Sequence, residues 1–240
     1  MMRSNGQAGW ELRMSTNRRT SVPFDPFHFE REASAGRRYS TVETFRKIYT
    51  ANMWSASERS GAGASFDQTR SVLTHLAALV EQLEVCTLLD VPCGDFRWMQ
   101  HLRADVRYIG GDVLPELVAA NERQWGGPSR RFMTLDLLKD DLPAADVLLC
   151  RDCLVHLSFE DIAAALRNIR RSGCGWLLTT TFPQCATNED IVTGDWRPIN
   201  LQEPPFRLSP PQLLLDEQCT ERGDTFVDKS LGLWRVEDLH

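Results

Sequence analysis

The 240-residue sequence lacks the features that would place it in a membrane, in an export route or on nucleic acid. No apolar run approaches the roughly 18 residues that a membrane span needs, and no apolar core of a secretory signal stands near the N-terminus. The net charge of −6 gives no general attraction for nucleic acid. We therefore expect a cytoplasmic protein that binds neither a membrane nor nucleic acid, and the sequence says nothing of its oligomeric state.

A disulfide framework and a cysteine-based metal site are also missing. The seven cysteines are odd in number, and several lie inside apolar, strand-like runs, which is typical of reduced buried thiols. Cys150 and Cys153 have the spacing of a metal or redox pair, but no second Cys pair or His pair is spaced to complete a zinc site. We interpret these two residues as buried thiols at a strand end and predict no metal site.

Glycine is scarce where a dinucleotide-binding loop would need it. An apolar run ends in Asp90 and is followed by Pro92-Cys93-Gly94-Asp95, which predicts a strand, a tight loop and a helix start. A nicotinamide-dinucleotide fingerprint needs three glycines, whereas Gly94 is alone here, and no Gly-Lys-Ser/Thr phosphate loop occurs. The loop favours an adenosine-type cofactor without phosphates, and a nicotinamide oxidoreductase is the weaker alternative.

Apolar periodicity divides the chain into an N-terminal extension and one domain. Residues 1–40 hold seven arginines against four acids, and we expect this stretch to be disordered or weakly ordered. The domain over residues 41–240 begins with two predicted helices, 41–56 and 66–83, joined by a glycine-containing hinge. We expect residues 41–84 to form a helical lid over an active site. An ordinary loop between two helices is an equal alternative.

Strands and helices then alternate, which is typical of a parallel, doubly wound sheet. The predicted strands cover residues 87–91, 106–111, 131–135, 146–150 and 176–181, and the predicted helices cover 96–103, 115–125 and 158–171. After a long loop over 182–208, two further strands at 212–218 and 230–236 are separated by no crossover helix. They predict an antiparallel pair at the sheet edge.

Charged or polar residues follow the predicted strands. In an open α/β sheet the ligand binds beyond the carboxyl ends of the strands, so these residues are candidates for one site. Asp112 lies 22 residues after Asp90, at the spacing of a carboxylate that grips a ribose diol. The carboxylate of Asp136 would suit the exocyclic amine of adenine. A helix starting near Asp95 would offer backbone N–H groups to a small carboxylate.

Four motifs resemble those of the class I S-adenosylmethionine-dependent methyltransferases over about residues 45–237. They are the glycine loop 90–95, the ribose-binding Asp112, the adenine-contacting pair Asp136-Leu137 and the stretch 151–157 after the fourth strand. An upstream segment with Ile48, Tyr49, Asn52 and Trp54, followed by a Ser-Gly-x-Gly loop, is similar to a bacterial subgroup. The resemblance implies an α/β, Rossmann-like, doubly wound seven-stranded sheet, mostly parallel with one antiparallel C-terminal strand. It also implies S-adenosyl-L-methionine (SAM) as the cofactor.

The resemblance implies roles for particular residues. Cofactor contacts are expected from Trp54, Asp90, Pro92, Cys93, Gly94, Asp112, Val113, Asp136, Leu137 and Arg151. His156 and Asp152 are candidate catalytic residues, because a general base helps a hydroxyl acceptor to react. For His156 the favoured alternative is a structural side chain under the cofactor. Acceptor contacts are expected from the long loop, with Asn188, Asp190, Asp195, Trp196 and Arg197 as candidates.

We expect methyl transfer to a small-molecule acceptor, and a hydroxyl of a sugar or secondary metabolite is the leading candidate. One alternative is a catalytically silent SAM-binding partner subunit. Another is a protein or nucleic-acid methyltransferase. The acidic composition and the absence of an Asn-Pro-Pro-Tyr-type amino-methylation motif disfavour a nucleic-acid substrate.

Overall fold

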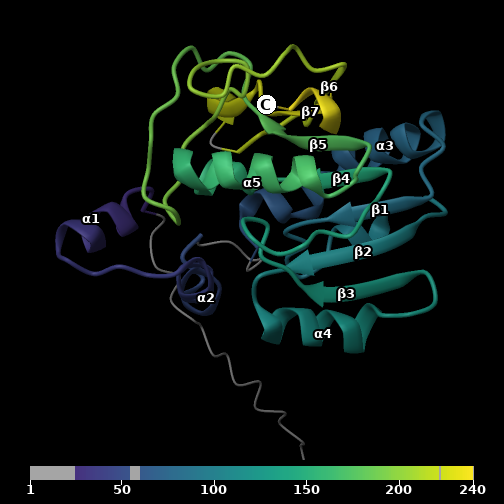
Figure 1. The fold of residues 1–240 in the computed structure, drawn as a ribbon, viewed down its shortest axis with the longest axis horizontal. Coiled ribbons are helices and arrows are strands. Elements are labelled where there is room, and N and C mark those ends of the chain that lie inside the picture. The colour runs from purple at the N-terminus through teal and green to yellow at the C-terminus, as the bar shows by residue number, and fades with distance from the viewer. Residues whose placement is uncertain (1–24, 55–59, 222, 240) are drawn as a thin grey trace, which may run out of the picture.

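The computed structural model describes residues 25–54, 60–221 and 223–239, and the disorder predicted for residues 1–24 lies outside them. Seven strands form one sheet in the order β3-β2-β1-β4-β5-β7-β6 (Figure 1). The strands are β1 (Thr87–Asp90), β2 (Arg107–Asp112), β3 (Arg130–Thr134), β4 (Val147–Cys150), β5 (Trp176–Thr181), β6 (Leu213–Asp216) and β7 (Ser230–Arg235).

Strand directions confirm the predicted fold class. β1 runs parallel to both β2 and β4, and β5 runs parallel to β4. β7 is antiparallel to both β5 and β6, so it is the one reversed strand of the sheet. All four residues of β1 and of β4 are buried, as expected for central strands with helices on both faces. The strand order reverses between β1 and β4, which makes the carboxyl ends of these strands the expected ligand-binding position.

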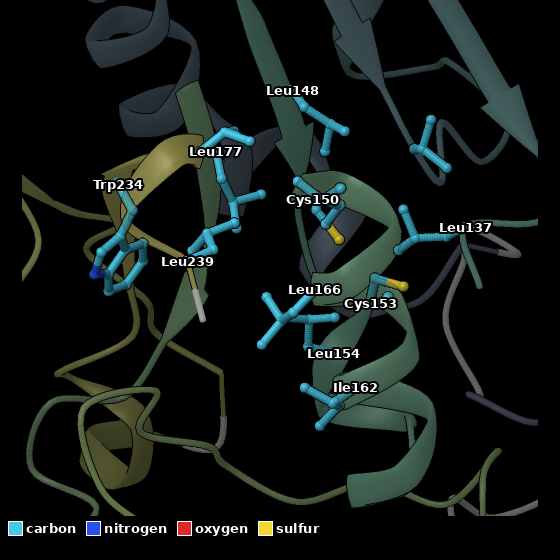
Figure 2. Packing of buried hydrophobic residues seen from close by; sticks show 14 of the residues in the cluster. Leu137, Leu148, Cys150, Cys153, Leu154, Ile162, Leu166, Leu177, Trp234 and Leu239 are labelled. Carbon is cyan, nitrogen blue, oxygen red and sulfur yellow. The ribbon is translucent and has the colours of Figure 1, made fainter. Parts of the chain in front are cut away.

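Helices cover both faces of the sheet. α5 (Phe159–Arg171) packs on one face, and α3 (Phe66–Gln82) and α4 (Pro115–Trp125) pack on the other. Successive side chains of a strand point to opposite faces of the sheet. Leu148 of β4 therefore packs in the cluster with α5 (Figure 2), and Leu149 packs in the cluster with α3. None of the helices in the described ranges is long and apolar enough to span a membrane.

The prediction of a helix over residues 96–103 is wrong. Phe96 has a left-handed φ of 60°, and the segment contains only a 3-10 turn, Met99–His101. The Phe96 ring packs within 5.0 Å of Tyr108 and Phe132, measured between ring centroids, and this buried aromatic contact fixes its backbone outside the helical region. No α-helix therefore starts near Asp95, and the expected helix N-terminus for a small carboxylate is absent from this segment.

The N-terminal part is more ordered than predicted from residue 25 onward. α1 (His28–Ser34) lies inside the expected extension, with Phe29 buried and its first turn held by Asp195. α2 (Thr41–Ala51) begins at a capping box between Ser40 and Glu43. This helix ends earlier than predicted because Asn52 is left-handed. Residues 55–59, which include the predicted end of this helix and precede the glycine-containing hinge, lie outside the described residues.

Candidate functional site

The carboxyl ends of β1, β2 and β4 open into a cavity of about 140 Å³, the first cavity. All the residues predicted to bind the cofactor or to act in catalysis line it: Trp54, Asp90, Pro92, Cys93, Gly94, Asp112, Val113, Asp136, Leu137, Arg151, Asp152 and His156. The structure therefore brings together residues that are spread over a hundred positions of the sequence. The predicted lid borders this cavity through Phe45, Ile48 and Tyr49 of α2.

Asp90 is the buried carboxyl group at the end of β1. Its side chain accepts a hydrogen bond of 2.6 Å from the Tyr108 hydroxyl. Burial raises the pKa of Asp90 to about 7, although the Tyr108 hydrogen bond and the Arg151 charge act in the opposite direction. A positively charged group placed beside this carboxyl would lower its pKa again, so the end of β1 is suited to an ammonium.

The loop after β1 requires glycine at position 94. Gly94 has a left-handed φ of 54°, and a Cβ atom there would lie 2.8 Å from the Ser60 hydroxyl. The Gly94 N–H donates to the Asp112 carboxylate at 3.2 Å, and the Asn121 side-chain amide donates to the Gly94 carbonyl at 2.7 Å. These bonds hold the loop backbone against the cavity.

Asp112 and Asp136 place two further carboxylates in the same cavity. Burial raises the pKa of Asp112 to about 6, although backbone N–H groups, led by that of Leu114, act to lower it. Asp136 accepts from the Leu138 N–H at 3.0 Å and lies 3.1 Å from the Lys139 ammonium, measured between side-chain atoms. Asp90 and Asp112 are the last residues of β1 and β2, and Asp136 lies two residues after β3, so each of these three strands supplies one acid at its carboxyl end.

His156 ends a buried 3-10 turn, Leu154–His156, after β4. Its Nδ1 lies 2.9 Å from the Asp195 carbonyl oxygen, and a carbonyl only accepts, so Nδ1 carries the proton and Nε2 keeps its lone pair. Burial lowers the pKa of His156 to about 4, which leaves the ring neutral at physiological pH. The Trp54 ring stacks on it with centroids 4.6 Å apart. Arg197 holds the turn by donating to the Leu154 and Leu157 carbonyls at 2.8 and 2.7 Å.

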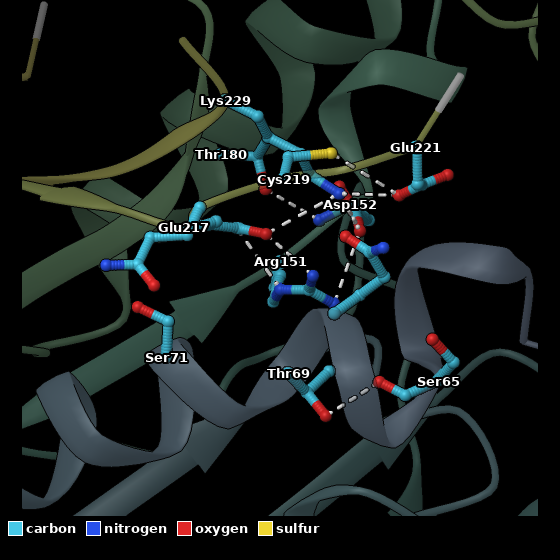
Figure 3. Close-up of polar contacts among 12 residues, drawn as sticks. Ser65, Thr69, Ser71, Arg151, Asp152, Thr180, Glu217, Cys219, Glu221 and Lys229 are labelled. Carbon is cyan, nitrogen blue, oxygen red and sulfur yellow. Dashed lines mark hydrogen bonds and ion pairs between the residues drawn. The ribbon is translucent and has the colours of Figure 1, made fainter. Parts of the chain in front are cut away.

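Five charged side chains, Arg151, Asp152, Glu217, Glu221 and Lys229, form a largely buried charge cluster (Figure 3). Asp152 of this cluster lines the first cavity together with His156. The Arg151 guanidinium lies 2.7 Å from Glu217 and 3.3 Å from Asp152, and the Lys229 ammonium lies 2.8 Å from Asp152. Burial would raise the pKa of Asp152, but Lys229 and Arg151 hold it well below its usual range. Asp152 is therefore a fixed carboxylate rather than a proton acceptor.

Three members of this cluster were missed by the sequence reasoning, namely Glu217, Glu221 and Lys229. Glu217 directly follows β6, and Lys229 directly precedes β7. Charged residues that flank apolar strands are the available signal, but the rule that a ligand binds beyond the carboxyl ends of parallel strands points only to the first five strands. The ion pairs of Glu217 with Arg151 and of Lys229 with Asp152 depend on β6 and β7 folding back beside β5, which no local pattern specifies.

The loop residues expected to contact an acceptor fall into two groups, those that stabilise the loop itself and one that lines a cavity. Asn188 donates to the Asn200 carbonyl, Asp190 accepts from the Phe159 N–H, and Arg197 donates to the Leu157 carbonyl beside His156. These three side chains therefore stabilise the loop through hydrogen bonds within the protein. The Asp195 carboxylate accepts from the first turn of α1. Trp196 lines a second cavity, which adjoins the first.

The described residues also settle the state of the cysteines and hold no evident metal centre. Cys150 and Cys153 are buried free thiols, as predicted, and the hydrogen bond between them together with burial raises the pKa of Cys153. Within residues 25–54, 60–221 and 223–239, no group of three or more His, Cys, Asp or Glu side chains is arranged to hold a metal ion.

Solved structures share this fold, whereas no family model and no curated protein matches the chain. PigF with SAH aligns with a TM-score of 0.59 at 15% identity, over 88% of this chain and 66% of that chain. Human N-acetylserotonin methyltransferase (ASMT) in complex with SAM gives 0.53 at 15% identity, over 89% and 62%. The methyltransferase domain of bacterial CtHen1-C gives 0.52 at 15% identity, over 71% and 98%.

These likenesses show a fold that SAM-dependent methyltransferases also have. The chain spans less than two thirds of the length of the human enzyme and 66% of PigF, so the activities of those whole proteins do not transfer with the fold. The closer resemblance to a bacterial subgroup stays a prediction.

Proposed function

We propose that the chain is a SAM-dependent methyltransferase that acts on a small-molecule acceptor. The observation that carries this proposal is the set of three buried acids, Asp90, Asp112 and Asp136, which follow successive strands and line one cavity. The cavity lies at the point of the sheet where the strand order reverses. The fold is one in which solved structures hold SAM or SAH.

The residues around the cavity fit the parts of SAM. Asp90, whose pKa burial raises to about 7, would gain from the ammonium of the methionine part. Asp112 would accept from the ribose hydroxyls, and Asp136 would accept from the adenine amine, with Leu137 beside the ring. Gly94 leaves room where a Cβ would collide with Ser60. When bound, SAM supplies a methyl group on a positively charged sulfur.

The residues after β4 are placed to handle the acceptor. The Nδ1 proton of His156 is held by the Asp195 carbonyl, so its Nε2 lone pair is available to take a proton from an acceptor. Trp54, stacked on the same ring, excludes water from one side. Asp152 stays ionised and would accept a hydrogen bond from the acceptor. The leading acceptor is a hydroxyl of a sugar or secondary metabolite.

Calorimetry with purified protein tests the cofactor site. We expect SAM to bind, and we expect Asp112→Ala to weaken binding by about 10- to 100-fold, because hydrogen bonds to a charged group contribute about 1.5–3 kcal/mol. Asp105→Ala is the matched control, since Asp105 is exposed and lines neither cavity. Absence of SAM binding, or equal affinity of Asp112→Ala and wild type, would overturn the proposal.

Turnover separates an enzyme from a silent partner subunit. Transfer of a labelled methyl group from SAM to compounds of a small-molecule extract is the expected result. A protein that binds SAM with the predicted Asp112 dependence, yet labels no small molecule, protein or nucleic acid, would fit the silent subunit. Enhanced NADH fluorescence on mixing would instead favour the oxidoreductase.

A further inference from the structure

A second cavity of about 310 Å³ adjoins the first. The two share four lining residues, Trp54, Ser60, Asp152 and His156. The imidazole of His156 therefore stands where the cavities meet. A compound in the second cavity can present a reacting group to this junction while the rest of it stays outside the first cavity.

One wall of the second cavity is aromatic. Phe182 follows β5, Trp196 comes from the long loop, and Phe226 comes from the 3-10 turn Gly223–Phe226. Their rings meet edge to face, with centroids 4.9 Å apart for Trp196 and Phe226 and 6.2 Å apart for Phe182 and Trp196. Three separate segments thus converge to offer π-faces and hydrocarbon, which bind an apolar ring or a cation.

Three members of the charge cluster, Asp152, Glu221 and Lys229, line the second cavity, and they pair with Arg151 and Glu217, which do not line it. Counted over the described residues, the cluster has two cations and three carboxylates, so these five side chains carry one net negative charge. Of the members that line the cavity, the carboxylates are the more accessible, since the side chains of Asp152 and Glu221 are 27% and 26% exposed, whereas that of Lys229 is 6% exposed. Because His156 is neutral, it does not cancel the excess.

Resting on the methyltransferase function proposed above, we propose that the second cavity holds the methyl acceptor and that this acceptor is a ring compound carrying one positively charged amine. The amine lies between the aromatic wall and the Glu221 carboxylate, where it balances the excess charge of the cluster. Acceptors with a phosphate or carboxylate are excluded, because Asp152 and Glu221 would repel them.

The same arrangement orients the reacting group. With the amine anchored at Glu221, a neutral hydroxyl at the other end of the compound reaches His156 at the junction. The hydroxyl lone pair takes the methyl group, whose bond to sulfur breaks with both electrons left on sulfur. The proton that the hydroxyl loses passes to Nε2 of His156 and from there to water.

Two matched sets of probes test the charge and the kind of ring. The first set is tyramine, 4-ethylphenol and 4-hydroxyphenylacetate, and the second is glucosamine, glucose and glucuronate, so each set holds a cation, a neutral compound and an anion. Binding is measured by calorimetry with S-adenosylhomocysteine present. In at least one set we expect the cation to bind at least ~10-fold more tightly than the neutral compound and the anion not to bind. The set that shows this preference identifies an aromatic amine or an amino sugar.

Glu221→Gln removes the excess charge without changing the shape of the cavity. We expect this variant to reduce the preference for the cation to about twofold or less, while SAM binding is unchanged because Glu221 does not line the first cavity. Glu237→Gln is the matched control, since Glu237 is exposed and lines neither cavity.

The outcomes separate this inference from the proposed function. Equal binding of cation and neutral compound, preference for an anion, binding of none of the probes, or an unchanged preference in Glu221→Gln would each overturn the inference while SAM binding remained intact. Loss of SAM binding in the wild-type protein would instead overturn the proposed function. SAM binding by Glu221→Gln also reports that the variant is folded.

Discussion

Asp90 and Asp152 lie at the carboxyl ends of the neighbouring strands β1 and β4, and their surroundings shift their pKa values in opposite directions. Burial raises the pKa of Asp90 to about 7, and the hydrogen bond that its side chain accepts from the neutral Tyr108 hydroxyl offsets this rise only in part. Asp152 is held well below its usual pKa, because Lys229 and Arg151 lie within 3.3 Å of it. Within the part of the chain that the structure describes, the first acid is in no ion pair and the charge of Arg151 acts on it only from a greater distance, whereas the second acid pairs with two cations.

This difference indicates how the two cavities work. On the β1 side the acids are held mainly by backbone N–H groups and a hydroxyl, so a ligand that brings a positive charge gains the most there. On the β4 side the charges of the described residues largely satisfy one another, and an excess of one negative charge is left for a ligand. Removing an acid should therefore impair binding on the first side, whereas removing a cation should impair stability on the second.

The largest expected effect comes from breaking the charge cluster. Lys229→Met would leave Asp152 and Glu217 with Arg151 as their shared cation in a buried setting, and breaking a buried ion pair in this way costs about 3–5 kcal/mol. The free energy of unfolding in urea measures the loss. Lys139→Met serves as the control, because Lys139 is exposed and its pair with Asp136 contributes about 1 kcal/mol or less. Equal losses in both variants would contradict the comparison.

The two sides also differ in what the sequence could predict. Asp90, Asp112 and Asp136 each follow a strand of apolar residues, and parallel strands bring their carboxyl ends to one edge, so strand periodicity alone predicts that they meet. Glu217 reaches Arg151, and Lys229 reaches Asp152, only because β6 and β7 return beside β5. Such long-range pairing has no short sequence signal.

Tertiary contacts also overrode local preference in two places. The stretch after Asp95 has a helical pattern of apolar residues, but the packing of Phe96 on Tyr108 and Phe132 prevents a helix from starting there. The segment around Phe29 has the composition of a disordered tail, yet the Asp195 carboxylate binds the first N–H groups of its helix. In both places the local structure depends on a contact with a residue that is distant in the sequence.

The pH dependence of cofactor binding measures the contribution of Asp90. Because its pKa is about 7, its carboxyl group is mostly protonated at lower pH and attracts an ammonium only as pH rises through that value. The affinity for SAM should increase severalfold from about pH 6 to about pH 7.5, below the range in which an α-amino group loses its proton. Calorimetry at each pH measures it.

Two controls isolate the Asp90 contribution to this pH dependence. Asp112, with a pKa of about 6, also ionises in this range. 5′-Methylthioadenosine lacks the ammonium, so the pH dependence of its binding measures the contribution of Asp112 alone. Asp90→Asn should bind SAM with no more pH dependence than this probe has with the wild-type protein. If the variant keeps the full slope, Asp90 is not the group that senses the ammonium.

The smallest effect is expected at an exposed ion pair that joins two helices bordering the first cavity, α2 and α4. Arg46 of α2 binds Glu116 of α4 through two hydrogen bonds of 2.7 and 3.2 Å, a geometry as close as that of the buried cluster. Both side chains are more than 40% exposed, so water competes for each charge, and Arg46→Met should lower the free energy of unfolding by about 1 kcal/mol or less. Urea unfolding beside Lys229→Met compares the two directly. A loss for Arg46→Met as large as that for Lys229→Met would mean that the distance between the charges, and not their burial, decides the contribution of an ion pair in this fold.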